Sequence, residues 1–308
     1  MTGPTPAAAG SERAKPPRMS AITSDDGGSG RAPEVLYDVD GHIATITLNR
    51  PHRRNAISVR MLHELSAAIE RVERDRGVRV VILTGAGAGF CSGLDIKDAM
   101  AGTGIGGGGN VSPSGGGGGD GGGGGGGSDF GRTTDLPTVA LHEMNTPVIA
   151  ALNGAAAGYG FDLGLGCDLR LAAGSARLLP GFAKRGIVPE SGGTWYLPRL
   201  VGWAKAAEIA YLGRDLTAVE AKELGLVNDV VDDTALMDTA KDWAGEIAVN
   251  APLAVQSIKR LFRAGMNEDF RTHSEHVLLQ LASLMRTQDF QEGLLSFMER
   301  RTPEFDGR

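Results

Sequence analysis

The hydrophobic residues of this chain recur in two rhythms, one typical of strands and one typical of helices. Residues 35–39 and 43–48 are rich in β-branched and other apolar side chains, and the Asp-Gly pair at 40–41 predicts a tight hairpin between them. Within 61–72, apolar residues return every three or four positions, which predicts an amphipathic helix. A continuous apolar run at 78–83 then predicts a buried strand.

The same succession of strand and helix returns further along the chain. Residues 148–152 and 169–172 have strand character, and a helix is predicted to begin near Gly158 between them. Strands that alternate with helices predict an α/β fold, in which helices cover a mostly parallel sheet. Residues 217–220 match a capping box, which predicts a short helix there. After Asp233 the patterns are amphipathic and helical, so we expect a helical region to follow the core.

One α/β core with additions at three places is therefore the predicted organisation. Residues 1–33 lack apolar periodicity and are predicted to form a disordered leader. The core is expected to span 34–232, and the helical C-terminal region 233–308. Most of residues 102–131 are glycine, which has the highest ordering cost of any residue and no side chain to bury. They are predicted to be a disordered insertion within the core.

Composition and charge narrow the function. The chain has 308 residues, a formal net charge of -6 and a hydrophobic share of 41%, as in an ordinary globular protein. It lacks the concentrated positive charge that nucleic acid requires and any apolar run long enough to span a membrane. The two cysteines, Cys91 and Cys167, have no metal-ligand spacing and cannot form a disulfide framework. We expect no metal, no nucleic-acid or membrane partner, and a cytoplasmic location.

Two glycine-rich blocks give the strongest functional signal. Residues 89–96 read Gly-Phe-Cys-Ser-Gly-Leu-Asp-Ile after an apolar run, and residues 147–168 hold a second run of alanines and glycines. The glycines of 85–89 do not make a dinucleotide fingerprint, because Phe90 stands where a third glycine is required. Together the two blocks resemble the signatures of the enoyl-CoA hydratase/isomerase (crotonase) superfamily. Further blocks in family order extend the resemblance, at 49–56, 186–189, 192–202 and 220–228.

The resemblance implies both a fold and a class of substrate. The implied fold is the α/β crotonase (ClpP/crotonase-like) spiral of ββα repeats, with a C-terminal helical region used for trimerisation. The implied substrate is an acyl-CoA, with coenzyme A arriving as part of the substrate and no separate cofactor. A homotrimer, or a hexamer of two trimers, is the family expectation.

The resemblance also implies a backbone oxyanion hole. A thioester oxygen gathers negative charge when its α-carbon loses a proton, and two N–H groups aimed at that oxygen stabilise the enolate. By resemblance the two donors are the N–H groups of Leu94 and Tyr159. Tyrosine at the second position is a departure from the glycine common in the family. The backbone donor is kept, and the side chain of Tyr159 is expected to point away from the thioester.

The acid/base residues depart further from the hydratase pattern. Family hydratases use two glutamates around one water; their positions here hold Asp162 and Phe182, and a phenyl ring cannot exchange a proton. Glu190 stands where some isomerases of the superfamily have their acidic residue, and its surroundings are closest to the ring-epoxide/enoyl-CoA isomerase-like members. The favoured prediction is an enoyl-CoA isomerase in which Glu190 is the principal acid/base and Asp162 assists.

Two other functions remain open at this point. An enoyl-CoA hydratase is one, with Asp162 and Glu190 sharing the water chemistry. A non-catalytic acyl-CoA-binding protein that keeps only the oxyanion hole is the other. The plain structural alternatives are a helix-capping role for Glu190 and a passive wall position for Asp162.

Recognition of CoA is predicted at two cations, again by resemblance. Arg53 stands where relatives often have a cation facing the CoA phosphates. Lys259 matches a recurrent family lysine that meets the nucleotide phosphate. An ordinary surface charge is the alternative for each.

Overall fold

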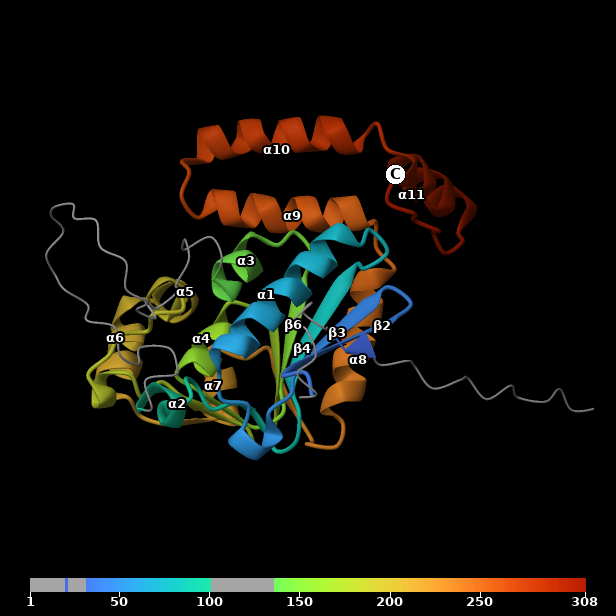
Figure 1. Cartoon of the computed structure of the whole chain (residues 1–308). Coiled ribbons are helices and arrows are strands. Elements are labelled where there is room, and N and C mark those ends of the chain that lie inside the picture. The colour runs from blue at the N-terminus through green and yellow to red at the C-terminus, as the bar shows by residue number, and fades with distance from the viewer. Residues whose placement is uncertain (1–19, 22–31, 101–135) are drawn as a thin grey trace, which may run out of the picture.

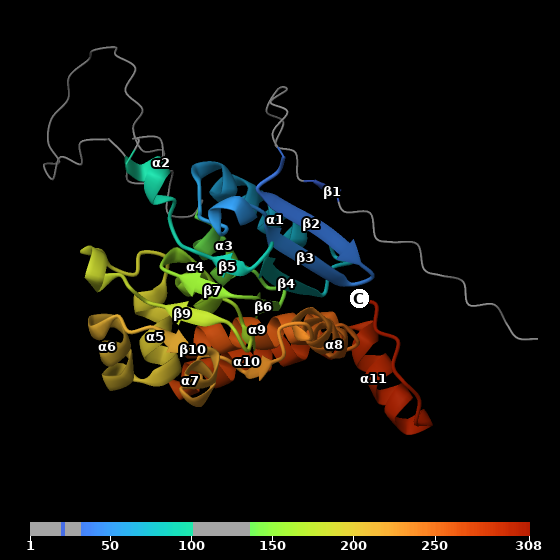
Figure 2. The ribbon, with the colours of Figure 1, turned by 90° about the horizontal axis from the view of Figure 1, so that it is seen from below.

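The computed structural model describes residues 20–21, 32–100 and 136–308 (Figure 1). Most of the predicted leader, 1–33, and all of the predicted glycine-rich insertion, 102–131, lie outside the described residues. Two sheets, the helices around them and a helical C-terminal region make up the described part (Figures 1 and 2).

The larger sheet carries the strands that the hydrophobic pattern predicts. β2 and β3 form the expected antiparallel hairpin around Gly41, whose positive φ of 57° suits the turn. Beyond β3, neighbouring strands run parallel. The sheet order is β1-β2-β3-β4-β6-β8-β11. The strand bounds are Ser20–Ala21 for β1, Val35–Asp40 for β2, Ile43–Leu48 for β3, Val80–Gly85 for β4, Val148–Leu152 for β6, Leu169–Ala173 for β8 and Asp229–Val231 for β11.

A second, smaller sheet was not predicted. Its order is β10-β9-β7-β5. The bounds are Gly89–Cys91 for β5, Ala155–Ala157 for β7, Arg177–Leu179 for β9 and Leu216–Thr217 for β10. The chain passes three times from a strand of the large sheet to a strand of the small one, from β4 to β5, β6 to β7 and β8 to β9. In the first two passages a helix follows at once, which produces the spiral of ββα repeats.

Helices cover both faces of the large sheet. α1 (Val59–Arg74) buries the apolar stripe predicted over 61–72, and its N-terminus is capped by the Ser58 side chain. α3 (Pro137–Glu143) packs beside α1, while α8 (Leu236–Ala248) packs on β3, β4, β6 and β8. The predicted capping box is present in α7 (Ala218–Glu223), where Thr217 and Glu220 bond reciprocally. The remaining short elements are η1 (Pro51–Arg53), α2 (Ile96–Met100), α4 (Tyr159–Leu165), η3 (Ala183–Arg185), α5 (Gly193–Val201) and α6 (Trp203–Leu212).

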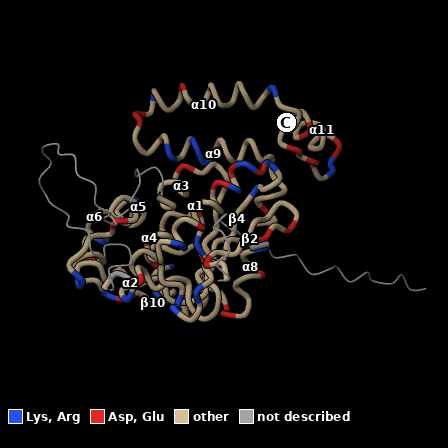
Figure 3. The backbone as a smooth tube through the Cα atoms, viewed as in Figure 1, with Lys and Arg blue, Asp and Glu red and all other residues tan. Residues whose placement is uncertain are grey.

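The C-terminal helices extend away from the sheets. α9 (Pro252–Gly265) lies between the core and α10 (Phe270–Leu284), and α11 (Gln288–Glu299) follows at one side (Figure 1). α10 buries none of its residues, and Leu278 and Leu279 on it are 63% and 68% exposed. Acidic and basic residues are interspersed over the rest of the described chain, whereas the middle of α10 carries neither (Figure 3). Among the described helices, none has the length and apolarity needed to cross a membrane.

Candidate active site

Two glycines bring the two signature blocks into contact. Gly93 follows β5 with φ at 91°, and Gly158 precedes α4 with φ at 51°. A Cβ added to Gly158 would lie 3.8 Å from Gly93 Cα, and one added to Gly93 would lie 3.0 Å from Ala157 O and 3.6 Å from Tyr159 N. Glycine is therefore required at Gly93 both for its backbone conformation and for this close approach. The residues that follow the two glycines, Leu94 and Tyr159, lie side by side in space as a result.

The backbone around Leu94 leaves its N–H unused. Gly93 O accepts from Ile57 N at 2.8 Å, and Asp95 N donates to Ile57 O at 3.0 Å. In this parallel bridge Ile57 bonds to the backbone groups of Gly93 and Asp95, the residues on either side of Leu94. The N–H of Leu94 therefore points away from Ile57. The N–H of Tyr159 belongs to the first turn of α4, where no intrahelical acceptor exists. Within the described parts of the chain neither N–H donates a hydrogen bond.

Two asparagines and a buried arginine fix the backbone of residues 85–95, which includes Leu94. Asn55 Nδ2 donates to Ala86 O and Gly89 O, at 2.9 and 2.7 Å, and Asn153 Nδ2 donates to the carbonyls of the same turn. The glycine-rich stretch at 85–89 is thus a turn from β4 into β5 that these side-chain hydrogen bonds stabilise. Arg50 pairs with Asp95 at 3.1 Å, just beyond Leu94. The two backbone donors are therefore fixed before any ligand arrives.

A cavity of about 610 Å³ adjoins Leu94 and Tyr159. Its remaining lining is mostly apolar, and comprises Leu62, Leu136, Thr138, Gly186, Ile187, Val188, Glu190 and Ser191. Apolar walls with a few placed polar groups are what a small-molecule site requires. The structure thus brings together three of the residues predicted for the site: Leu94, Tyr159 and Glu190.

Glu190 lies at the edge of this cavity. It precedes α5 and remains exposed while lining the cavity wall. Partial loss of water raises the pKa of its carboxyl above the ordinary glutamate value. Among the described lining residues it is the one carboxylate. It is therefore placed to exchange protons with a ligand in the cavity.

Asp162 lies deeper than the sequence alone indicated. It is fully buried in α4, and its Oδ2 accepts from Ser191 Oγ at 2.9 Å and from Ser191 N at 3.2 Å. Gly193 permits this position, since a Cβ there would lie 2.1 Å from Asp162 Oδ1. Burial raises the pKa of Asp162 to about 7, and the hydrogen bonds from Ser191 offset only part of that rise. Ser191, rather than Asp162, forms the cavity wall.

Phe182 and Ser191 lie on opposite sides of the sequence prediction: Phe182 was singled out and Ser191 was not. Phe182 is buried and lines a separate cavity of about 330 Å³ between η3, α5 and α6. It thus lies outside the lining of the Glu190 cavity. Ser191 was missed by the sequence reasoning, although its place between Glu190 and the glycine pair at 192–193 was a usable signal.

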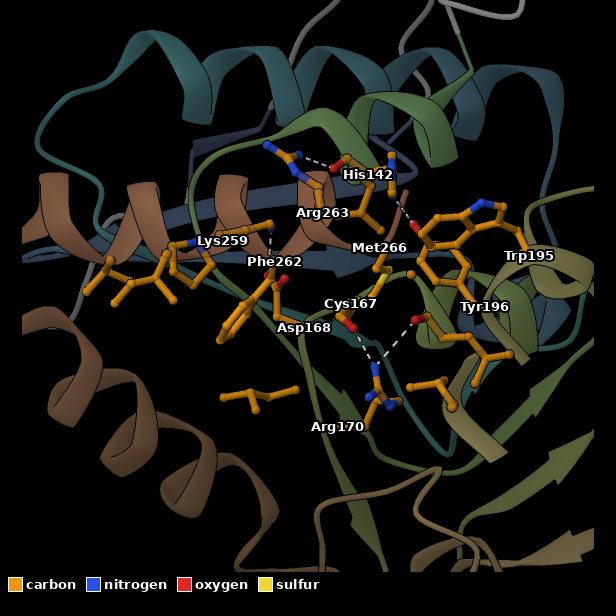
Figure 4. Close-up of a pocket in the computed structure, with 18 residues that line it drawn as sticks. His142, Cys167, Asp168, Arg170, Trp195, Tyr196, Lys259, Phe262, Arg263 and Met266 are labelled. Atoms are coloured by element: carbon orange, nitrogen blue, oxygen red, sulfur yellow. Dashed lines mark hydrogen bonds and ion pairs between the residues drawn. The ribbon is translucent and has the colours of Figure 1, made fainter. Parts of the chain in front are cut away.

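The two predicted CoA-binding cations occupy different surroundings. Arg53 is half-buried in η1, and its carbonyl accepts from Ser92 Oγ at 3.4 Å, two residues before Leu94. Lys259 is 9% exposed; its Nζ pairs with Asp168 Oδ2 at 2.6 Å and donates to Thr146 O at 3.0 Å (Figure 4). The structure therefore places Arg53 near Leu94 but Lys259 in an internal ion pair. Lys259 lines a different cavity, of about 350 Å³, between α9 and the core.

Comparison with known proteins identifies the family. The enoyl-CoA hydratase/isomerase family matches residues 38–108 and 126–308. The chain is 36% identical over 280 residues to the 1,2-epoxyphenylacetyl-CoA isomerase of Escherichia coli K12, covering 89% of this chain and 98% of that protein. It is 34% identical over 271 residues to a short-chain-enoyl-CoA hydratase of Clostridium acetobutylicum, covering 88% and 96%. An enoyl-CoA hydratase structure from Mycobacterium tuberculosis H37Rv superposes with a TM-score of 0.77 at 33% identity, covering 90% of this chain and 100% of that one.

This chain belongs to the enoyl-CoA hydratase/isomerase family and has the crotonase fold. It is an enzyme of that superfamily, as the sequence predicted.

Proposed function

We propose that the protein is an enoyl-CoA isomerase that moves a double bond within the acyl chain of a CoA thioester. One observation carries the proposal: Glu190 lines the same cavity as Leu94 and Tyr159, whose N–H groups are unused. A single carboxylate beside an oxyanion hole suffices for a proton to leave one carbon and return to another.

The reaction follows from these three residues. The carboxylate of Glu190 takes a proton from C2 of a 3-enoyl-CoA, and the electron pair of that C–H bond passes into the thioester. The resulting enolate oxygen accepts hydrogen bonds from the N–H groups of Leu94 and Tyr159. The neutral Glu190 then returns the proton at C4, while the double bond moves to C2–C3. The product is a 2-enoyl-CoA, and Glu190 is again a carboxylate.

Asp162 assists this chemistry through Ser191. Its carboxyl accepts both hydrogen bonds of Ser191, the residue that follows Glu190 in the chain. It therefore holds the backbone that carries Glu190 against α4. In this proposal Asp162 is a positioning residue, because Ser191 stands between it and the cavity.

The alternative is an enoyl-CoA hydratase, the activity named for the Clostridium relative. Hydration by two carboxylates needs both to reach one water in the cavity. Asp162 is fully buried and Phe182 carries no ionisable group, so the observed arrangement favours the isomerase. Arg53 is proposed to meet the CoA phosphates from its place near Leu94, whereas Lys259 is left out of this role because its ammonium group is paired with Asp168.

A homotrimer, or a hexamer of two trimers, is also proposed. The support is apolar surface on the C-terminal helices, which include Phe262 and Phe297 at 70% and 84% exposure. Large apolar side chains that are exposed together on one part of the surface are typical of faces that are covered in an assembly.

The wild-type protein tests the proposal with two matched substrates. Trans-3-hexenoyl-CoA should be converted to the 2-enoyl isomer faster than trans-2-hexenoyl-CoA is hydrated, as measured by the absorbance of the conjugated thioester. Asp162→Asn should retain most of this isomerase activity. Predominant hydration that is lost in Asp162→Asn would favour the hydratase, and tight binding without turnover of either substrate would favour a non-catalytic protein.

A further inference from the structure

A second apolar cavity adjoins the candidate active site. It has a volume of about 330 Å³ and lies between η3, α5 and α6. These elements lie together on the side of the molecule away from α11 (Figures 1 and 2). Alanines, prolines and larger apolar side chains form most of its wall, and none of its described lining residues carries a charge. The cavity therefore suits a hydrocarbon ligand.

Ile187 and Val188 separate this cavity from the active site. Both residues line the cavity of about 610 Å³ that holds Leu94, Tyr159 and Glu190, and both also line the second cavity. The two cavities thus meet along one short stretch of chain, which ends two residues before Glu190. A ligand that leaves the first cavity over these two side chains enters the second.

The separating stretch presents apolar surface and has little backbone support. Ile187 N donates to Phe182 O at 3.3 Å, whereas Val188 N donates to no acceptor among the described residues and Pro189 has no N–H. The side chains of Ile187 and Val188 are 48% and 67% exposed. A hydrocarbon chain that crosses them covers apolar surface otherwise in contact with water, which stabilises the bound state.

Phe182 keeps an ionisable group out of the second cavity. It occupies the position that holds a glutamate in family hydratases, and here its ring is buried and lines this cavity. A carboxylate in the same place would lose its water when an apolar ligand bound, which is costly. The substitution that weakens the case for hydration thus suits a cavity that takes hydrocarbon.

Two aromatic side chains of α6 also line the cavity and remain uncovered. Trp203 is 77% exposed and Tyr211 is 71% exposed. Apolar surface of this kind, gathered around a cavity, marks a site that a ligand covers. The ligand already placed on the other side of Ile187 and Val188 is the acyl group.

We propose that the acyl chain of the substrate extends from the active site across Ile187 and Val188 into this second cavity, so that the enzyme prefers hydrocarbon acyl groups longer than hexanoyl. The thioester oxygen is held at Leu94 and Tyr159, the reacting carbons lie beside Glu190, and the remaining carbons reach the second cavity. The residues that line it determine chain-length specificity. This inference rests on the proposed acyl-CoA function and names the class of acyl group.

Calorimetric binding of saturated acyl-CoAs to the full-length protein tests this without requiring turnover. The probes are hexanoyl-, octanoyl-, decanoyl- and dodecanoyl-CoA, each used below its critical micelle concentration. Each methylene removed from water tightens binding by up to about fourfold. The affinity of the wild type should therefore rise by at least about tenfold from hexanoyl-CoA to decanoyl-CoA.

Ala210→Phe fills the second cavity and leaves the first unchanged. Ala210 is half-buried on α6 and lines the cavity, so the added ring occupies the space proposed for the chain. This variant should bind hexanoyl-CoA normally and lose the gain for decanoyl-CoA. Trp203→Ala removes an exposed part of the wall and should reduce the gain. Ala204→Phe on the same helix is the matched control; Ala204 is exposed outside the cavity lining, so the gain should be kept.

The contrary results separate three claims. Equal wild-type affinity for hexanoyl-CoA and decanoyl-CoA, or a gain that survives in Ala210→Phe or Trp203→Ala, would overturn the path of the chain. A surviving gain together with a changed oligomeric state of Ala210→Phe in light scattering would assign the cavity to a second copy instead. Failure of the wild type to bind any of the four probes would overturn the acyl-CoA function itself. Circular dichroism melting checks the fold of each variant.

Discussion

The buried carboxyl of Asp162 makes the stability of the protein depend on pH. Its pKa is about 7 in the folded protein, against 3.8 as the ordinary value. Between these values the folded protein holds a proton that the unfolded chain has released, so the free energy of unfolding falls as pH rises. Above about pH 7 the loss is complete, because both states are then ionised.

Asp162→Asn should remove this dependence, since an amide does not titrate. From pH 5 to pH 8 the free energy of unfolding of the wild type should fall by about 2–3 kcal/mol relative to the variant. Urea unfolding of both proteins at the two pH values measures the difference. A gap between wild type and variant that does not change with pH would show that Asp162 is ionised at pH 5 in the folded protein.

The ionisation of Glu190 should determine how catalysis depends on pH. Only the carboxylate can accept the C2 proton, so kcat/KM for 3-hexenoyl-CoA should rise with pH and level off above the pKa of Glu190. Because desolvation raises that pKa, the rise should occur at higher pH than for an ordinary glutamate. A profile of kcat/KM against pH tests this. A midpoint at or below the ordinary glutamate value would contradict a desolvated Glu190 as the base.

At this scale the sequence indicated which residues meet but not how deeply each lies. Gly93 and Gly158 stand in the motifs that carry the family resemblance, and that resemblance implied the meeting of Leu94 and Tyr159. The burial of Asp162 depends on the missing Cβ of Gly193, and the ion pair of Lys259 depends on the packing of α9 against Asp168. Neither contact is encoded in local spacing, because the partners come from distant segments.

Among the elements, the contact between α4 and β5 is the one on which the oxyanion hole depends. A Cβ at Gly160 would lie 2.4 Å from Cys91 O, so Gly160→Ala must push the helix and strand apart. It should destabilise the protein by about 1–3 kcal/mol and lower kcat. Gly164→Ala in the same helix is the control, since its Cβ would lie 3.5 Å from Leu152 Cδ2, an ordinary contact. Thermal melting and 3-hexenoyl-CoA turnover measure both effects; equal behaviour of the two variants would contradict this packing.

Prediction from sequence succeeded for the elements whose apolar residues recur at regular spacing. The stripe of α1, the hairpin of β2 and β3 and the strands β4, β6 and β8 follow from apolar periodicity, with β4 displaced by two residues from its expected bounds. The small sheet was missed because β5, β7 and β9 have three residues each, and β7 consists of alanine alone. Such strands are too short to show a period of two and are held by pairing between distant segments.

For the whole molecule, the exposed face of α10 predicts self-association. Apolar side chains on a helix without buried residues are stabilised if another copy covers them. The double variant Leu278→Glu, Leu279→Glu should therefore convert the predicted trimer to monomer, as read by size-exclusion chromatography with light scattering. Glu275→Gln on the same helix should leave the assembly unchanged. A monomeric wild type, or a trimeric double variant, would contradict a role for α10.

The most direct measurement for the whole account is single-turnover conversion of trans-3-hexenoyl-CoA by wild type and Glu190→Gln, with hexanoyl-CoA affinity measured in parallel. Glu190→Gln keeps the shape of the side chain and removes its ability to accept a proton. We predict unchanged hexanoyl-CoA affinity and a rate lower by about 10²–10⁴-fold, as expected for loss of general acid/base catalysis. A variant that converts the substrate at the wild-type rate would contradict the assignment of Glu190 as the acid/base.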